Sequence, residues 1–179
     1  TDTLYGLGGD PRHQGAISRI FALKGRAPDQ PLPLVAADHT QAEAAGAFSP
    51  LARALALHFW PGPLTLVVAA GNSLAEGVDG GTRTVGVRVP DHAVARALAA
   101  FVGFPIVSTS ANRSGSAASR VAEEAVTGLA EDLVDVLLDS GPTPGGAPST
   151  VVDVRADLPK LLRAGAVPFD RVLDWVGRR

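Results

Sequence analysis

A short apolar run, Gly103-Phe-Pro-Ile-Val107, passes directly into eight small and mostly polar residues, Ser108-Thr-Ser-Ala-Asn-Arg-Ser-Gly115. The apolar run predicts a buried strand, so the polar residues would lie just past a strand's end. Ligand loops of α/β proteins occupy that position. Because small hydroxyl and amide side chains can hydrogen-bond a polar ligand, this stretch is either a ligand loop or an ordinary Ser/Asn-rich connection.

A second candidate element is Lys24-Gly-Arg26, at the end of a segment with apolar residues at helical spacing. The chain holds only two lysines, so a lysine one residue away from an arginine is distinctive. The pair offers a mobile point charge and a planar fork, which together suit a polyphosphate or a carboxylate. Cations also complement the exposed carbonyls at a helix C-terminus, so an ordinary basic helix end is an open alternative.

Strand and helix patterns alternate along the chain. Thr84-Val-Gly-Val-Arg-Val89 alternates strictly, with valines on one face and Arg88 on the other. Arg88 is therefore either a solvated strand residue or a cation that lines a cleft. Helices are predicted after the capping residues Asp10, Ser49 and Asp91. The third helix runs through Phe101, and its spacing predicts that Val94, Leu98 and Phe101 pack inward.

Further strands are predicted at 32–37, 64–70, 134–138, 149–154 and 158–162. Pro33 interrupts the first of these, which favours a place at a sheet edge. The alternation of strands with uneven helices predicts an α/β fold built on a twisted open sheet of mixed strand direction.

Composition bounds the classes of protein and site. With 179 residues and 46% hydrophobic content, we expect one domain over residues 1–179. Cysteine is absent and the four histidines lack metal-ligand spacing, so no protein metal site is expected. The net charge of −2 includes no basic block, and no apolar run is long enough for a membrane span. We expect a soluble, cytoplasmic protein; the start at Thr1 and the absence of methionine suggest a truncated N-terminal strand that hides any targeting signal.

Six segments in this order resemble the YrdC-type threonylcarbamoyl-AMP synthases, also called the TsaC type. The family's lysine-x-arginine and serine-x-asparagine signatures fall on Lys24, Arg26, Ser110 and Asn112. The segments are Thr1-Asp-Thr-Leu-Tyr-Gly-Leu-Gly8, Lys24-Gly-Arg26, Trp60-Pro-Gly-Pro-Leu-Thr65, Ser110-Ala-Asn-Arg-Ser-Gly115, Ser149-Thr-Val-Val-Asp153 and Leu162-Arg-Ala-Gly165. The resemblance covers nearly the whole chain and implies the YrdC-like fold, with helices flanking the sheet and a large concave cleft.

The resemblance also implies a reaction and a set of site residues. The enzyme would be a nucleotidyltransferase that makes threonylcarbamoyl-AMP and pyrophosphate from L-threonine, bicarbonate or CO₂, and ATP with its Mg²⁺. A partner enzyme would then transfer the threonylcarbamoyl group to an adenosine of tRNA. The implied catalytic residues are Lys24, Arg26, Ser110 and Asn112; ATP would be bound by Arg26, Gln30, Thr65, Ser110, Asn112 and Arg163, and threonine by Thr3, Ser108 and Ser149.

Two alternatives stay open. Related domains have been described as double-stranded-RNA binders, so a cleft that holds RNA or tRNA without catalysis is one. A carbamoyl-adenylating domain of the kind found in hydrogenase-maturation proteins is the other. Steep salt dependence of RNA affinity without ATP turnover would favour the first, and ATP turnover with carbamoyl phosphate but not threonine would favour the second.

Overall fold

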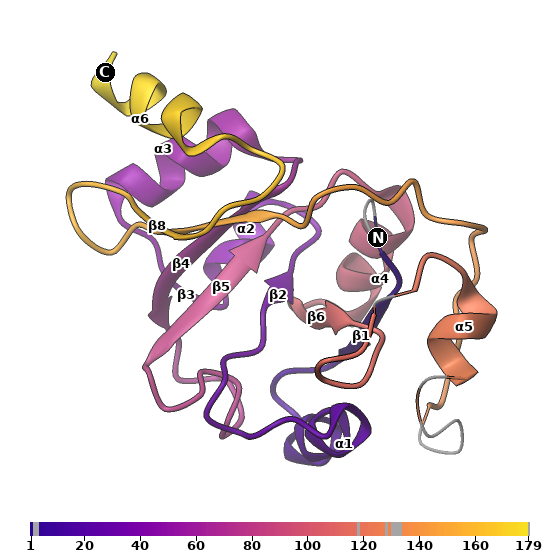
Figure 1. The fold of residues 1–179 in the computed structure, drawn as a ribbon. Coiled ribbons are helices and arrows are strands. Elements are labelled where there is room, and N and C mark those ends of the chain that lie inside the picture. Colours follow the sequence, from indigo (N-terminus) through magenta and orange to yellow (C-terminus); the bar gives the residue numbers. More distant parts are fainter. Residues whose placement is uncertain (2–3, 118, 128, 130–133, 179) are drawn as a thin grey trace.

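The computed structural model describes residues 1, 4–117, 119–127, 129 and 134–178. Within these residues, one eight-stranded sheet runs in the order β1-β6-β2-β5-β4-β7-β8, with β3 paired to β4 beside that path (Figure 1). The strands are β1 (Gly6–Gly9), β2 (Leu34–Val35), β3 (Gly46–Ala47), β4 (Leu64–Ala70), β5 (Thr84–Arg88), β6 (Ile106–Ser110), β7 (Thr150–Asp153) and β8 (Lys160–Arg163).

Strand directions are mixed. The pairs β2–β5 and β4–β7 are parallel, and the other pairs are antiparallel. The predicted open mixed sheet is therefore confirmed. The edge position predicted for residues 32–37 is wrong, because β2 lies between β5 and β6. Pro33 precedes the paired residues, and its carbonyl accepts a hydrogen bond from the Ser108 amide, so the missing N–H of this proline interrupts no pairing.

Six helices are present in the described part of the chain, and side-chain caps start four of them. The capping residues are His13, Asp38, Ser49 and His92, each of which accepts a hydrogen bond from a backbone N–H in the first turn. The helices are α1 (Gln14–Lys24), α2 (His39–Glu43), α3 (Pro50–Phe59), α4 (Ala93–Val102), α5 (Ala122–Thr127) and α6 (Phe169–Gly177). The cap predicted at Ser49 is confirmed.

The caps predicted at Asp10 and Asp91 are wrong, because His13 and His92 begin those helices. The Asp10 carboxylate instead accepts hydrogen bonds from the backbone amide and guanidinium of Arg12, which closes a turn before α1.

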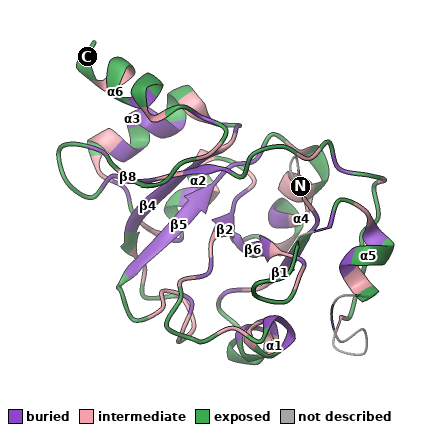
Figure 2. Cartoon of the chain, in the orientation of Figure 1, coloured by how far each residue is buried: buried purple, intermediate pink, exposed green. Residues whose placement is uncertain are grey.

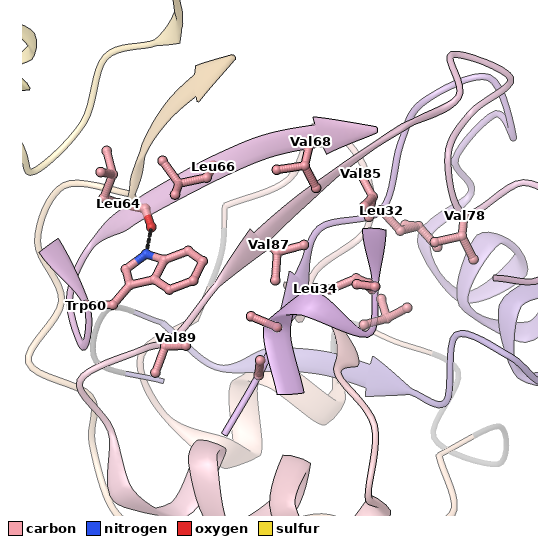
Figure 3. Close-up of a cluster of buried hydrophobic side chains, with 14 of the residues drawn as sticks. Leu32, Leu34, Trp60, Leu64, Leu66, Val68, Val78, Val85, Val87 and Val89 are labelled. Atoms are coloured by element: carbon pink, nitrogen blue, oxygen red, sulfur yellow. Dashed lines mark hydrogen bonds between the residues drawn. The ribbon is translucent and has the colours of Figure 1, made fainter. Parts of the chain in front are cut away.

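One face of the sheet carries the hydrophobic core. Val85 and Val87 of β5 are fully buried, as are Leu66 of β4 and Leu34 of β2. Figure 3 shows these side chains gathered in one cluster, where the Trp60 indole donates a hydrogen bond to the Leu64 carbonyl at 2.6 Å. Helices α1 and α3 contribute to the same cluster. Because neighbouring residues of a strand face opposite sides, a one-residue slip would expose all these side chains, and burial of each contributes about 1.5–3 kcal/mol.

Helix α4 covers a small part of the opposite face. Its Ala99 packs with Val35 and Ile106 in a second, smaller cluster. Leu98 packs against this cluster, but the inward packing predicted for Val94 and Phe101 is wrong, since these side chains are 41% and 91% exposed. Two residues correspond to about 200° around a helix, so the side of α4 that buries Ala99 turns Phe101 toward solvent. Figure 2 shows the buried central strands β4 and β5, the exposed edge strand β8 and the exposed outer helix surfaces.

The strand predicted at 134–138 is also wrong. These residues form no strand, and Val136, Leu137 and Leu138 keep 71%, 49% and 49% of their surface exposed. Their apolar pattern resembles a strand, but no strand in the described residues pairs with them. Among the helices described, none is both long and apolar enough to cross a membrane.

Candidate active site

A cavity of about 530 Å³ lies on the sheet face opposite the main core. Its floor follows from the strand alternation, because Thr84, Gly86 and Arg88 of β5 point away from the buried Val85 and Val87. Strands β4, β6 and β7, with the residue before β7, supply further lining side chains, which include Thr65, Val67, Ser108, Ser110, Ser149 and Val151. The same alternation thus forms the core on one face and the floor of a cleft on the other.

Two buried hydroxyls meet on this floor. Thr65 Oγ1 and Ser149 Oγ are 2.8 Å apart and share a hydrogen bond. Arg163 Nη2 donates to the Ser149 hydroxyl at 3.1 Å and to the Ser149 carbonyl at 2.8 Å. These contacts join β4, β7 and β8 and hold the two hydroxyls at fixed positions beside a guanidinium.

Three guanidinium groups line the cavity, those of Arg26, Arg88 and Arg163. No described lining residue is acidic, so the cavity is suited to an anion. Arg88 is 7% exposed, and its Nε donates to the Gly62 carbonyl at 2.8 Å. Burial lowers the pKa of both Arg26 and Arg163, which remain protonated near neutral pH. An anionic ligand would add negative charge beside these cations and form charge-assisted hydrogen bonds with them.

Arg26 is only partly satisfied by the protein. One Nη donates to the Pro31 carbonyl at 3.1 Å, whereas its buried Nε has no hydrogen-bond partner. A buried unpaired donor is costly in a folded protein, so this nitrogen is a candidate ligand contact.

Lys24 lies beneath the serine-x-asparagine loop. Its side chain is buried, and Nζ donates to the Ser110 carbonyl at 2.6 Å and to the Asn112 carbonyl at 2.8 Å. The loop returns this contact, because the Ser114 amide donates to the Lys24 carbonyl. Burial, with the nearby charge of Arg26, lowers the pKa of Lys24 to about 8. The solvated helix-end alternative is therefore wrong for Lys24, although α1 ends there, at Gly25 with φ of +56°.

Asn112 closes the same loop. Its Nδ2 donates to the carbonyls of Arg113 and Ser116 at 2.9 and 2.6 Å, while its buried Oδ1 has no partner. The loop that follows β6 is thus held from below by Lys24 and from within by Asn112.

Tyr5 connects the cavity wall to the segment that follows the apolar run at 134–138. Its hydroxyl donates to Asp139 Oδ1 at 2.6 Å and contacts the Gly141 carbonyl at 2.8 Å. The hydrogen bond to Asp139 raises the pKa of Tyr5 and lowers that of Asp139. The Arg120 guanidinium donates to the Thr143 and Pro144 carbonyls and holds the next part of this segment.

The structure brings most of the predicted site residues to one cavity. Its lining includes Arg26, Thr65, Ser108, Ser110, Ser149 and Arg163. The side chains of Lys24, Gln30 and Asn112 are not in that lining; Gln30 is exposed, and the other two organise the loop. Thr3 lies outside the described residues.

Sequence reasoning left Thr84 and Tyr5 out of the site and kept Arg88 as an open alternative. The strict alternation of residues 84–89 is the signal that could have placed Thr84 and Arg88 together on the cleft face. No comparable signal marked Tyr5, since its contact with Asp139 spans 134 residues of sequence.

The described residues contain no group of three or more histidine, aspartate or glutamate side chains that could hold a metal ion. The cavity therefore offers cations and hydroxyls rather than a carboxylate cage. It can bind and neutralise a polyanion, and it can hydrogen-bond a small polar ligand.

Comparison with known proteins gives a consistent result. The Sua5/YciO/YrdC family model, described as telomere recombination, matches residues 1–165. A threonylcarbamoyl-AMP synthase of Bacillus subtilis is 37% identical over 99% of this chain and 51% of its own length. One from Pyrococcus abyssi is 38% identical over 99% of this chain and 52% of its own length.

A solved structure gives the same picture at the level of the fold. The crystal structure of P. abyssi Sua5 complexed with L-threonine superposes with a TM-score of 0.89 and 37% identity, and covers 98% of this chain and 52% of that one. The present chain therefore spans about half the length of the two curated relatives and of this structure.

Proposed function

This chain belongs to the Sua5/YciO/YrdC family, and from that premise we propose that it is a threonylcarbamoyl-AMP synthase. Its substrates would be L-threonine, bicarbonate or CO₂, and ATP, and its products threonylcarbamoyl-AMP and pyrophosphate. The observation that carries the proposal is the cavity itself, where three guanidiniums and several hydroxyls gather without a described acidic residue in the lining. Such a cavity suits a nucleotide triphosphate beside a small polar amino acid.

The chemistry requires positioning more than covalent catalysis. The threonine amine adds to CO₂ to form a carbamate, and a carbamate oxygen attacks the α-phosphorus of ATP. The new O–P bond forms as the bond from the α-phosphorus to the bridging oxygen breaks, and pyrophosphate leaves with that electron pair. Charge builds on phosphate oxygens during this step, so fixed cations lower the barrier.

Residue roles follow from the contacts. In this proposal Arg26 and Arg163 bind phosphate oxygens, with the unpaired Nε of Arg26 as one donor. Ser108, Ser149 and Thr65 hydrogen-bond the amino acid and the carbamate, and Ser110 contacts the nucleotide. Lys24 and Asn112 act through the loop they hold, so their removal would disturb Ser110. Gln30 and Thr3 remain predicted contacts for ATP and threonine.

Mg²⁺ would enter as part of the ATP complex. The described residues provide no carboxylate cluster for a resident ion, which fits a cation held mainly by phosphate oxygens and water. The product is a reactive mixed anhydride, so we also propose that a separate transfer enzyme consumes it and modifies an adenosine in tRNA.

The test is pyrophosphate release from ATP and bicarbonate with threonine, serine, valine or no amino acid. Threonine should give the fastest release. Serine lacks one methyl, so its kcat/KM should be lower by about 10- to 200-fold. Valine lacks the hydroxyl and would leave buried polar groups unpaired, so it should be worse than serine.

The folded Arg26→Ala variant is the matched control for site-dependent release, and its rate should fall strongly. Release at one rate under all four amino-acid conditions would contradict the proposed function. RNA affinity that falls steeply with salt, without threonine-dependent turnover, would favour a binding module instead.

A further inference from the structure

Gly86 is a glycine that the fold does not require. It lies in the middle of β5, where the pairing with β4 runs without a shift through Leu66–Val87, Val67–Gly86 and Val68–Val85. Its φ lies outside the left-handed region, so any L-residue could adopt this backbone conformation. Glycine in a strand interior costs stability relative to alanine. Where the strand has no bulge, such a glycine often marks the close approach of a ligand or of another backbone segment.

Two other sheet glycines, Gly8 and Gly46, are required by nearby backbone atoms. A Cβ at Gly8 would lie 2.8 Å from the Val107 carbonyl oxygen, and one at Gly46 would lie 2.2 Å from the Ala69 carbonyl oxygen. Backbone atoms cannot move away easily at those positions. A Cβ at Gly86 would meet only methyl groups, Thr65 Cγ2 at 3.1 Å and Val67 Cγ2 at 3.9 Å. Alanine at this position therefore needs the Thr65 methyl to move by a few tenths of an ångström, while the Thr65 hydroxyl keeps its hydrogen bond to Ser149.

The missing side chain leaves a small apolar recess in the cavity floor. The methyl groups of Thr65 and Val67 border it. The Thr65 hydroxyl and its hydrogen-bonded partner Ser149 lie immediately beside it, because Thr65 carries both a methyl and a hydroxyl on the same carbon. Arg163 holds Ser149 in turn, so the polar side of the recess is fixed.

This pattern of methyl beside hydroxyl is complementary to one kind of ligand. The side chain of threonine also carries a methyl and a hydroxyl on the same carbon. Against this floor its hydroxyl can pair with Thr65 or Ser149 while its methyl rests on the bare Cα of Gly86. Alanine at 86 would occupy the space over that Cα.

We propose that Gly86 is a specificity-determining residue whose bare backbone accepts the methyl group of the amino-acid substrate. This inference rests on the proposed function and adds to it the residue of the cavity floor that lets the enzyme distinguish threonine from serine. ATP does not need the recess, so the effect of filling it should fall on the amino acid.

The experiment uses Gly86→Ala in the full chain, with pyrophosphate release and threonine binding by calorimetry as separate readouts. The KM for threonine should rise by roughly 10-fold or more, since one methyl contact is lost and replaced by a clash. The KM for ATP should change by less than about 3-fold, and the ratio of serine to threonine kcat/KM should rise by roughly 10-fold. The melting temperature should stay level or rise, because alanine lowers the entropy of the unfolded chain.

Gly9→Ala is the matched control. Its Cβ would meet a side chain at a similar distance, Ile20 Cδ1 at 3.2 Å, but Gly9 does not line the cavity. If Gly86→Ala melts early, the double variant Gly86→Ala/Thr65→Ser removes the methyl at 3.1 Å and keeps the hydroxyl. Its threonine KM and its serine preference should then show the same changes relative to Thr65→Ser alone.

Each outcome decides something. In one outcome, the wild type shows threonine-dependent release of pyrophosphate, and folded Gly86→Ala keeps the wild-type KM for threonine and the wild-type ratio of serine to threonine kcat/KM. This outcome overturns the role of Gly86 and leaves the proposed function intact. A change confined to the KM for ATP overturns it equally. If the wild type binds threonine without pyrophosphate release, and Gly86→Ala binds threonine more weakly, the recess stands and the proposed function fails. Absence of threonine binding to the wild type overturns both.

Discussion

Replacing Lys24 with methionine tests the buried ammonium beneath the serine-x-asparagine loop. Methionine is similar in length but carries no charge and no donor. The change leaves the Ser110 and Asn112 carbonyls without the contacts they now make at 2.6 and 2.8 Å. It also removes a cation that burial and Arg26 disfavour. The two effects oppose one another, and pH separates them.

The magnitude follows from the pKa. A decrease from 10.5 to about 8 in the folded state corresponds to about 3 kcal/mol, at about 1.36 kcal/mol for each pKa unit. The two carbonyl contacts favour the ammonium form, so about 3 kcal/mol is an upper limit. Between about pH 8 and 10.5 the folded chain binds fewer protons at Lys24 than the unfolded chain. The free energy of unfolding therefore rises with pH in this window for the wild type relative to Lys24→Met.

The assay is urea unfolding of the wild type and the variant at intervals from pH 7 to 10.5. Taking the difference between the two removes groups that titrate in both, including Tyr5. Lys160→Met is the matched control, because Lys160 is the other lysine of the chain and is exposed on β8. Its curve should run parallel to that of the wild type. Parallel curves for Lys24→Met as well would refute the lowered pKa and the buried charge on which this reasoning depends.

Two further predictions concern contacts at the cavity wall. Arg163→Lys should weaken ATP binding by roughly 10-fold in calorimetry, because lysine lacks the planar guanidinium that can contact Ser149 and a phosphate together. As a control, substitution of the exposed Arg171 by lysine should leave ATP affinity at the wild-type value. Tyr5→Phe should raise the pKa of Asp139 in a carboxyl NMR titration, since the Tyr5 hydroxyl is the main cause of its low value. The stability advantage of the wild type over Tyr5→Phe should then be present above the ordinary pKa of 3.8 and disappear as the pH falls through the lowered one. An unchanged pKa of Asp139 in Tyr5→Phe would contradict the main role of the Tyr5 hydrogen bond, and wild-type ATP affinity in Arg163→Lys would contradict a contact between Arg163 and phosphate.

Local patterns predicted the parts of the fold that depend on neighbouring residues. The helix from Ser49 and the strand around Val85 follow from capping and alternation. The apolar run before Ser108 predicted a strand there, but the strand extends through Ser110, so the prediction that Ser108 lies past its end is wrong. Arg26, Thr65 and Arg163 were predicted from the family resemblance. No single pattern in the sequence predicts that these three residues lie at one cavity. These residues lie far apart in the chain: sheet pairing brings Thr65 of β4 and Arg163 of β8 together, and the connection after α1 places Arg26 at the same cavity.

The errors have a common physical cause. Phe101 of α4 and the residues 134–138 are apolar in sequence, but only the tertiary arrangement decides whether another segment covers them. Lys24 shows the converse, because a helix-end lysine became buried when the loop after β6 folded over it. Local signals report what a segment can bury, whereas contacts between distant segments decide what it does bury.

Strand β5 shows how closely the fold and the site are linked. Val85 and Val87 must face the core, so Thr84, Gly86 and Arg88 must face the cleft. Any change of register that moved the cleft residues would also expose the valines, which ties the geometry of the site to the stability of the sheet. A residue on the cleft face, in contrast, can vary without cost to the core. Gly86 lies on that cleft face, where glycine is less stabilising than alanine in a strand interior, which agrees with the role in ligand recognition that we propose for it.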